Sequence, residues 1–180
     1  GTEYQRKYFI SYPDSVMVMK FTANKKGKQN LVLSYCPNSE AESYLSADGN
    51  NGLVYTGVLD NNKMKFAFRI KALHKGGILK TENDRIIVKD ADEVVFLLTA
   101  DTDYKMNSNP DFNDPQTYVG KDPEQTTLAM MNNALEKGYD ELLRNHKTDY
   151  TALFNRVQLQ INPEAGTPDL PTYKRLDNYR

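Results

Sequence analysis

A succession of short, strand-like segments runs through residues 1–104, and it limits the possible folds more than any other feature of the sequence. The segments are rich in β-branched and aromatic residues, and many alternate apolar with polar positions, as strands with one buried face do. Stretches rich in Gly, Asn and Asp separate them and tolerate the positive φ angles of tight turns. Many short strands with closely spaced turns predict an antiparallel β-sandwich. The expected strands are residues 4–11, 16–22, 31–35, 53–59, 63–73, 78–81, 85–88 and 94–100.

Two of these segments predict how the sandwich is layered. Between residues 64 and 72 the even positions are mostly apolar and Lys65, Arg69 and Lys71 are basic, so this strand should bury one face and expose the other. Residues 94–98 are apolar without alternation, which favours a central strand that is covered on both faces. The acidic run at 90–93 is expected to form a solvated turn. The fold class is therefore mainly β.

Helix signals begin after a long polar loop at residues 105–121. Asp122 is placed as an N-cap, Pro123 as the first helical residue, and Gln125 as the partner in a capping box. Gly138 suits a helix end, and a second helix is expected from Tyr139, so the two should form an antiparallel α-helical hairpin. The apolar stripes are expected to hold Leu128, Met131, Ala134 and Leu135 in the first helix, and Leu142, His146, Tyr150, Leu153 and Phe154 in the second.

These patterns divide the chain into three parts. Residues 1–118 form the expected β-sandwich domain, and residues 119–155 form a helical hairpin linker. Residues 156–180 are expected to hold a short strand at 157–161 and then an extended linker that contains several prolines. Because linkers connect domains, we expect the chain to be a piece of a larger protein.

Composition excludes several classes of partner. The sequence has 180 residues, with 23 basic and 24 acidic residues, so its charge gives no reason to expect nucleic acid or an anionic membrane as a partner. No apolar run approaches the roughly 20 residues that cross a bilayer. Cys36 is the only cysteine, which excludes an intrachain disulfide and a cysteine-rich metal site. In its apolar run, Cys36 is expected to be a small buried or half-buried hydrophobe rather than a catalytic thiol.

Three stretches together carry a resemblance to a known family. The amino end reads Y-x-R-x-Y-F-x-S-x-P from Tyr4, and the second expected helix contains H-x-x-D-Y-x-x-L-F-x-R-V from His146. The run L-P-T-x-x-R-L follows from Leu170. These stretches resemble glycoside hydrolase family 95, the α-L-fucosidases. The chain is similar to the later part of that family's amino-terminal β-sandwich, one half of a super-sandwich, with the linker that leads to an (α/α)6 catalytic barrel.

The resemblance implies a function for the parent enzyme more than for this chain. Members of the family hydrolyse terminal α-L-fucosyl linkages with inversion, and their catalytic residues lie in the barrel. No catalytic residue is therefore carried over to this chain, and its substrate-binding residues stay unknown. The chain would be a non-catalytic structural module, inactive alone and without a cofactor, whose partners are the (α/α)6 domain of the same polypeptide and a fucosylated glycan. A periplasmic or secreted, bacterial enzyme is implied. The loop at 105–121 is a hypothesis for the rim of the active-site pocket.

Hydrolysis of a glycosidic bond needs two carboxyl groups on either side of the scissile oxygen. Asp101 and Asp103 follow the expected central strand and are the candidates within this chain. The acidic residues at 90–93 are better explained by a turn, and Glu40 and Glu42 by a solvated surface. No catalytic residue is therefore assigned.

A metal site has one candidate region. Asp and Asn side chains recur at Asp101, Asp103, Asn107, Asn109, Asp111, Asn113 and Asp114, and such hard oxygen ligands suit calcium. The EF-hand spacing fails, because Phe112 stands where glycine is needed and Tyr118 where the bidentate glutamate is needed. We expect a solvated loop and no metal, with an irregular calcium site as the alternative. His74 and His146 are too far apart in sequence for a helical zinc pair, and His146 is expected to be a packing residue.

The aromatic residues at the amino end support a second interpretation. Tyr4, Tyr8 and Tyr12 share one face of the first expected strand, with Phe9 on the other, and flat rings of this kind can pack against sugars. Strand aromatics more often pack in the core or across strands, and the chain has no Trp. A stand-alone carbohydrate-binding or interaction β-sandwich is therefore the alternative to the structural module.

Overall fold

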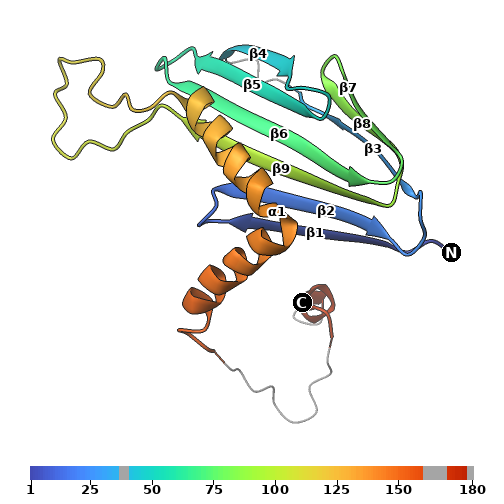
Figure 1. The fold of residues 1–180 in the computed structure, drawn as a ribbon. Coiled ribbons are helices and arrows are strands. Elements are labelled where there is room, and N and C mark those ends of the chain that lie inside the picture. The colour runs from blue at the N-terminus through green and yellow to red at the C-terminus, as the bar shows by residue number, and fades with distance from the viewer. Residues whose placement is uncertain (37–40, 160–169, 178–180) are drawn as a thin grey trace.

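The computed structural model describes residues 1–36, 41–159 and 170–177, and they form two β-sheets followed by a long bent helix (Figure 1). The first sheet has six strands in the order β1-β2-β9-β6-β5-β4, and the second has three in the order β3-β8-β7. All strand pairs are antiparallel, which confirms the mainly β fold class. The strands are β1 Tyr4–Ser11, β2 Val16–Ala23, β3 Gln29–Ser34, β4 Ala41–Ala47, β5 Gly52–Leu59, β6 Lys65–Lys75, β7 Ile78–Glu82, β8 Arg85–Ala91 and β9 Glu93–Thr102.

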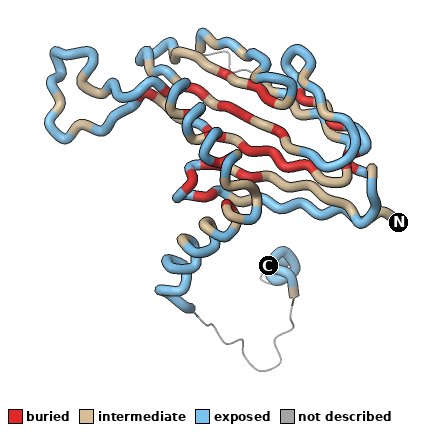
Figure 2. Tube along the Cα trace, in the orientation of Figure 1, coloured by how far each residue is buried: buried red, intermediate tan, exposed pale blue. Residues whose placement is uncertain are grey.

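Strand β9 lies at the centre of the fold and is buried on both faces, as its unbroken apolar run predicts. Val94 and Phe96 pack into the core between the two sheets, with Ile70 of β6. Val95 and Leu97 face the other way, into a second core beneath the helix. Each such side chain contributes about 1.5–3 kcal/mol when it leaves water. Figure 2 shows the buried residues running along the central strands of the six-stranded sheet.

Strand β6 corrects the expectation that its basic face is exposed. Arg69 is only 5% exposed, because this face is turned toward the helix side of the sheet and its charge is matched. Arg69 and Lys71 both contact the carboxylate of Asp48, at 2.6 and 3.2 Å. The neighbouring Ala67 is also buried. Alternation therefore identifies the strand, whereas the exposure of its polar face depends on what packs there.

The run at 90–93 does turn between two strands, as predicted, but only Asp90 is exposed, whereas Asp92 and Glu93 are half-buried. β8 extends to Ala91, which is fully buried in the core between the sheets, and β9 begins at Glu93. Glu93 contacts Lys20 at 2.6 Å and Lys75 at 3.0 Å. Asp92 accepts a hydrogen bond of 2.7 Å from the Gly27 amide of another turn. These acidic side chains therefore join neighbouring strands rather than face open water.

One strand of the described structure, β4, was not predicted from the sequence. β4 has small and polar residues and lies at the edge of the six-stranded sheet, where it pairs with β5 alone. Cys36 lies just beyond the end of β3 and is exposed, so the expectation that it is buried or half-buried is wrong.

Helix α1 spans Pro123–Phe154 and begins where the sequence predicts. Asp122 is the N-cap, and its carboxylate accepts a 3.0 Å hydrogen bond from the Glu124 amide. Gly138 interrupts the helix with φ 70° and ψ 173°, so both predicted helical segments exist. They form one bent helix rather than the expected antiparallel hairpin (Figure 1).

The first segment of α1 lies across the outer face of the six-stranded sheet (Figure 1). Its buried stripe contains Thr127, Met131 and Ala134, whereas Leu128, which was predicted to lie on the stripe, is 37% exposed and lies off it. Thr127 can be buried because its polar groups are satisfied. Its hydroxyl donates to the Pro123 carbonyl at 2.9 Å, and its own carbonyl accepts from the Thr99 hydroxyl of β9 at 3.0 Å.

The second segment of α1 is buried mainly at Leu142, and its end is exposed. Beyond it, residues 157–159 are not in a strand, and the rest of the predicted strand, residues 160 and 161, lies outside the described residues. The expected linker contains a six-residue helix, α2 Thr172–Asp177, that the sequence analysis did not predict. Within the described part of the chain, no helix has the length and apolar content that a membrane crossing needs.

Candidate functional site

The two candidate catalytic carboxylates hold backbone at the end of the central strand. Asp103 is 7% exposed and accepts a 3.0 Å hydrogen bond from the amide of Lys65, where β6 begins. Asp101 is half-buried and accepts a 2.8 Å hydrogen bond from the Thr102 amide. Both carboxylates therefore have structural partners at the junction between β9 and the loop that follows.

The loop at 105–121 is an ordered projection beside the start of α1 (Figure 1). At its base, Tyr104 forms an isolated β-bridge with Val119, and its ring stacks on Tyr118 with centroids 6.0 Å apart. Farther out, the Asn107 amide group donates to the carbonyl of Thr117 at 3.1 Å. These contacts close the loop on itself and present its tip to solvent.

Several side-chain oxygen atoms of the candidate calcium site accept hydrogen bonds within this loop. The side chains of Asn107, Asp111 and Asp114 each accept a hydrogen bond from the backbone amide two residues later, at 2.8–3.0 Å. Across residues 1–36, 41–159 and 170–177, no group of three or more His, Cys, Asp or Glu side chains is arranged to hold a metal ion. His74 is exposed on β6, far along the chain from His146 on α1.

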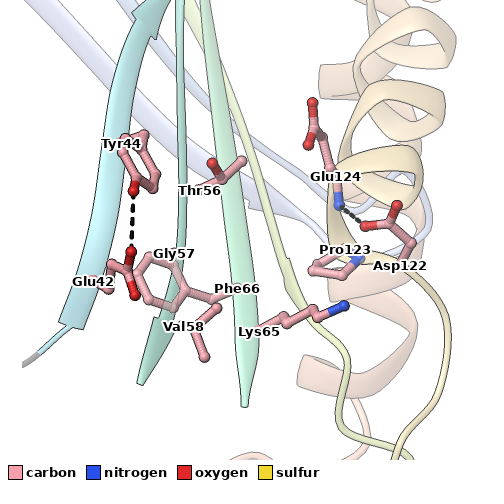
Figure 3. A pocket seen from close by; sticks show the side chains of 10 residues that line it. All are labelled: Glu42, Tyr44, Thr56, Gly57, Val58, Lys65, Phe66, Asp122, Pro123 and Glu124. Atoms are coloured by element: carbon pink, nitrogen blue, oxygen red, sulfur yellow. Dashed lines mark hydrogen bonds between the residues drawn. The ribbon is translucent and has the colours of Figure 1, made fainter. Parts of the chain in front are cut away.

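A hollow of about 370 Å³ lies where β4, β5 and β6 meet the start of α1 (Figure 3). Tyr44 of β4 donates a 3.0 Å hydrogen bond to Glu42, and this hydrogen bond, with the charge of the carboxylate, raises the pKa of the tyrosine. Figure 3 shows Thr56 and Lys65 on the neighbouring strands and Glu124 on the helix. This hollow could not be predicted without β4, and the small and polar residues of that strand have little periodicity that would indicate it.

The hollow can offer hydrogen bonds to a polar ligand, but it is not built like a hydrolytic centre. Two of its three acidic side chains already hold other parts of the chain, since Glu42 accepts from Tyr44 and Asp122 caps α1. A glycosidase needs two carboxyl groups on opposite sides of one scissile bond, with one of them kept protonated. With Glu42 and Asp122 engaged within the chain, the hollow does not present such a free pair.

A second polar centre surrounds Asp14 in the turn between β1 and β2. Its side chain is fully buried, and it accepts hydrogen bonds from the Ser11 hydroxyl at 2.5 Å and from Lys137 of α1 at 2.7 Å. The Asn145 amide group donates to both carboxylate oxygens, at 3.2 and 3.3 Å. Burial alone would raise the pKa of Asp14, but the hydrogen bonds from Lys137, Ser11 and Asn145 together hold it below its usual value. In sequence, Asp14 resembles an ordinary turn residue.

Aromatic rings connect β1 to the end of α1. Phe9 contacts the rings of Tyr139 and His146, at centroid distances of 5.9 and 5.1 Å. His146 stacks on Tyr150 at 5.8 Å, and Tyr150 stacks on Phe154 at 5.3 Å. His146 is therefore a packing residue, as expected. The row runs from half-buried Phe9 to Phe154, which is 63% exposed.

Tyr4 and Tyr8 lie on the opposite face of β1, Tyr12 follows in the turn after that strand rather than on its face, and all three are largely exposed. Tyr4 and Tyr8 are each 55% exposed and Tyr12 is 83% exposed. Tyr8 also contacts the edge of Phe21 on β2, with centroids 5.9 Å apart. The packing role expected for strand aromatics therefore holds for Phe9 and in part for Tyr8.

Comparisons with known proteins find relatives that align with nearly the whole chain. The chain is 28% identical over 188 aligned residues to a protein named probable alpha-fucosidase A from Aspergillus niger, covering 99% of this chain and 23% of that protein. It is 23% identical to alpha-L-fucosidase 2 from Arabidopsis thaliana, covering 90% of this chain and 21% of that protein. The chain thus spans about a quarter of the length of these relatives. They come from a fungus and a plant, so they do not support the expected bacterial source.

A solved structure and a family model agree on the fold. A putative kojibiose phosphorylase from human microbiome superposes with a TM-score of 0.52 at 9% identity, over 85% of this chain and 21% of that one. This likeness shows the fold alone. Residues 1–107 match the model described as glycosyl hydrolase family 65, N-terminal domain. The expected resemblance to the amino-terminal domain of α-fucosidases is confirmed, and the matching model carries the family 65 name rather than family 95. The chain belongs to the glycosyl hydrolase family 65 N-terminal domain family.

Proposed function

We propose that this chain is a non-catalytic structural module of an α-L-fucosidase-like glycoside hydrolase, which supports a catalytic domain in the same polypeptide. The two relatives named as α-fucosidases support the parent activity, because nearly the whole chain aligns with about a quarter of each of them. The parent would hydrolyse terminal α-L-fucosyl linkages of a glycan with inversion. A periplasmic or secreted location belongs to the same proposal and has only the family resemblance as support.

The observation that carries the proposal is the apolar surface at the end of α1. Tyr150, Leu153 and Phe154 are 50–63% exposed, and Val157 and Leu159 after the helix are 80 and 82% exposed. Exposed apolar residues that occur singly are ordinary, but a group like this marks an interaction surface. It lies on the segment that leads away from the sandwich, where a following domain would contact it.

The loop at 105–121 adds a second place for contact with that domain. Its base is fixed by the Tyr104–Val119 bridge, while Met106 and Phe112 are 75 and 84% exposed. A fixed loop with exposed apolar side chains can enter a neighbouring pocket at little cost in conformational entropy. We propose that it contributes to the rim of the active-site pocket. Unchanged kcat/KM in a parent enzyme with a shortened loop would contradict this role.

The first experiment compares this chain with a longer polypeptide that includes the catalytic domain. Hydrolysis of 2′-fucosyllactose and of an aryl α-L-fucoside is measured for both at matched concentrations. Activity in the longer polypeptide alone supports the proposal. Turnover by the purified chain would contradict it, and loss of that turnover in Asp101→Asn or Asp103→Asn would then identify the reacting groups. No fucosidase activity in either would reject the assigned parent reaction.

A stand-alone carbohydrate-binding domain is the second candidate, and the exposed row of Tyr4, Tyr8 and Tyr12 favours it. Flat rings exposed on β1 and in the turn after it can stack against the C–H face of a sugar. Calorimetric titration of the chain with fucosylated oligosaccharides distinguishes the two candidates. Binding that is lost in Tyr8→Ala and Tyr12→Ala, but kept in Tyr44→Ala, would favour the binding domain over the structural module.

A further inference from the structure

The bend of α1 is a position where the backbone alone does not fix the direction of the chain. Gly138 has φ 70°, in the left-handed region that glycine adopts at little cost, and an added Cβ there would meet no atom within 4 Å. Packing at the glycine itself therefore does not define the angle between the two segments. Contacts made by other residues must set it.

Both segments of α1 are held to the sandwich by side-chain packing. The first segment is fixed to the six-stranded sheet through buried Met131 and Ala134. The second reaches the sandwich through Leu142 and through the packing of Tyr139 and His146 on Phe9, and farther on its side chains are exposed. The amine of Lys20 on β2 also lies 4.2 Å from the centroid of the Tyr139 ring. Apolar contacts of this kind are non-directional and define an orientation less sharply than hydrogen bonds do.

The Asp14 carboxylate joins three parts of the fold at this point. It lies in the β1–β2 turn, where Ser11 donates to it. It accepts from Lys137, the last residue before Gly138, and from Asn145, two turns into the second segment. One buried side chain thus holds the residues on both sides of the bend and ties them to the hairpin.

We infer that Asp14 is a positioning residue that sets the direction in which the second segment of α1 leaves the β-sandwich. This inference does not depend on the proposed function, because it concerns the geometry of this chain alone. Within a parent enzyme, the same direction would determine where the exposed end of α1 meets the following domain. Asn145 carries the contact to the second segment, and Lys137 carries the contact to the first.

The test measures the distance between spin labels on the sandwich and on the second segment. Labels are placed at exposed Lys26 and Lys147, each replaced by Cys in a Cys36→Ser background, and read by double electron–electron resonance. The doubly labelled chain with no further substitution should give one narrow distance distribution. Asp14→Ala should shift the mean of this distribution and broaden it. Asn145→Ala should shift the mean in the same direction and broaden the distribution, while leaving the hairpin contacts of Asp14 in place.

The matched control is Asp48→Ala, which removes another carboxylate with two cationic partners, both of which lie on β6 and not on α1. It should leave the distance distribution unchanged. Slow amide exchange in β9 verifies that each variant keeps its sheet, and Asn145→Ala decides the result if Asp14→Ala does not fold. An unchanged narrow distribution in Asn145→Ala and Asp14→Ala overturns the inference, as does equal broadening in Asp48→Ala.

Discussion

At the scale of single residues, the fully buried carboxylate of Asp14 is the polar group whose removal should destabilise the chain most. Asp14→Ala leaves Lys137, Asn145 and Ser11 without their shared acceptor. Breaking a buried, hydrogen-bonded ion pair should lower the free energy of unfolding by about 2–4 kcal/mol. Urea denaturation followed by circular dichroism measures the change. A loss below about 0.5 kcal/mol, typical of a surface substitution, would contradict this assignment.

The same residue predicts a dependence of stability on pH. Burial alone would raise the pKa of Asp14, but its hydrogen-bond partners hold the pKa below the ordinary value of 3.8. A carboxyl group whose pKa is lower in the folded state stabilises the fold above its unfolded pKa, and this contribution is lost as pH falls through the folded pKa. The charged groups nearby are Lys137 and, around that amine, Glu136 and Glu141.

We therefore expect the stability difference between the wild type and Asp14→Asn to be largest near neutral pH and to shrink as pH falls below about 4. Urea denaturation across a pH series measures this difference. Asp48 and Glu93 also have lowered pKa values, because hydrogen bonds from their cationic partners outweigh the effect of burial. They contribute acid sensitivity to both proteins and cancel in the comparison. A difference that stays constant from neutral to acid pH would contradict the linkage to Asp14.

At the scale of elements, the turn between β6 and β7 should tolerate substitution less than the bend of α1. Gly77 and Gly138 have similar positive φ angles, 66° and 70°. A Cβ at Gly77 would lie 2.2 Å from the Lys89 carbonyl, whereas one at Gly138 would meet nothing within 4 Å. Gly138→Ala should cost about 1–3 kcal/mol from the backbone conformation alone, and Gly77→Ala should cost more. Equal losses in thermal unfolding experiments would contradict this ranking.

Local patterns predict most elements of this fold because hydrophobic periodicity and turn residues are local properties. The central position of β9 follows from its unbroken apolar run, and the start of α1 follows from Asp122 and Pro123. β4 was missed because an edge strand of small and polar residues has little periodicity, and its pairing with β5 defines it. Ala91 is buried because β8 and β9 pack there, although the charges around it suggest a turn.

The candidate site was less predictable, since its contacts join residues far apart in sequence. Gly138 predicts that a helix ends, but the direction of the next segment depends on Asp14, which precedes Lys137 by 123 positions. Likewise, the hollow of Figure 3 brings β4 and β5 together with the start of α1. The expected catalytic candidates, Asp101 and Asp103, are close to one another in sequence, yet the structure gives both of them backbone partners.

At the scale of the whole molecule, the exposed end of α1 should matter more for association with another domain than for folding of this chain. Leu153 and Phe154 are 57 and 63% exposed, so Leu153→Ser with Phe154→Ser should change the free energy of unfolding by no more than about 0.5 kcal/mol. In a longer polypeptide that contains the following domain, the same pair of substitutions should lower the melting temperature. It should also separate the unfolding transitions of the two domains, because their shared apolar contact is lost.

Calorimetry of both lengths of polypeptide measures these effects, and Val32→Thr is the matched control. Val32 is 63% exposed on β3 of the smaller sheet, in a different layer of the fold from α1. It should have no effect on the coupling between domains. If the substitutions on α1 destabilise the short chain strongly, the surface belongs to the core of this domain. If they leave the long polypeptide unchanged as well, the catalytic domain docks elsewhere, and the loop at 105–121 becomes the surface to test next.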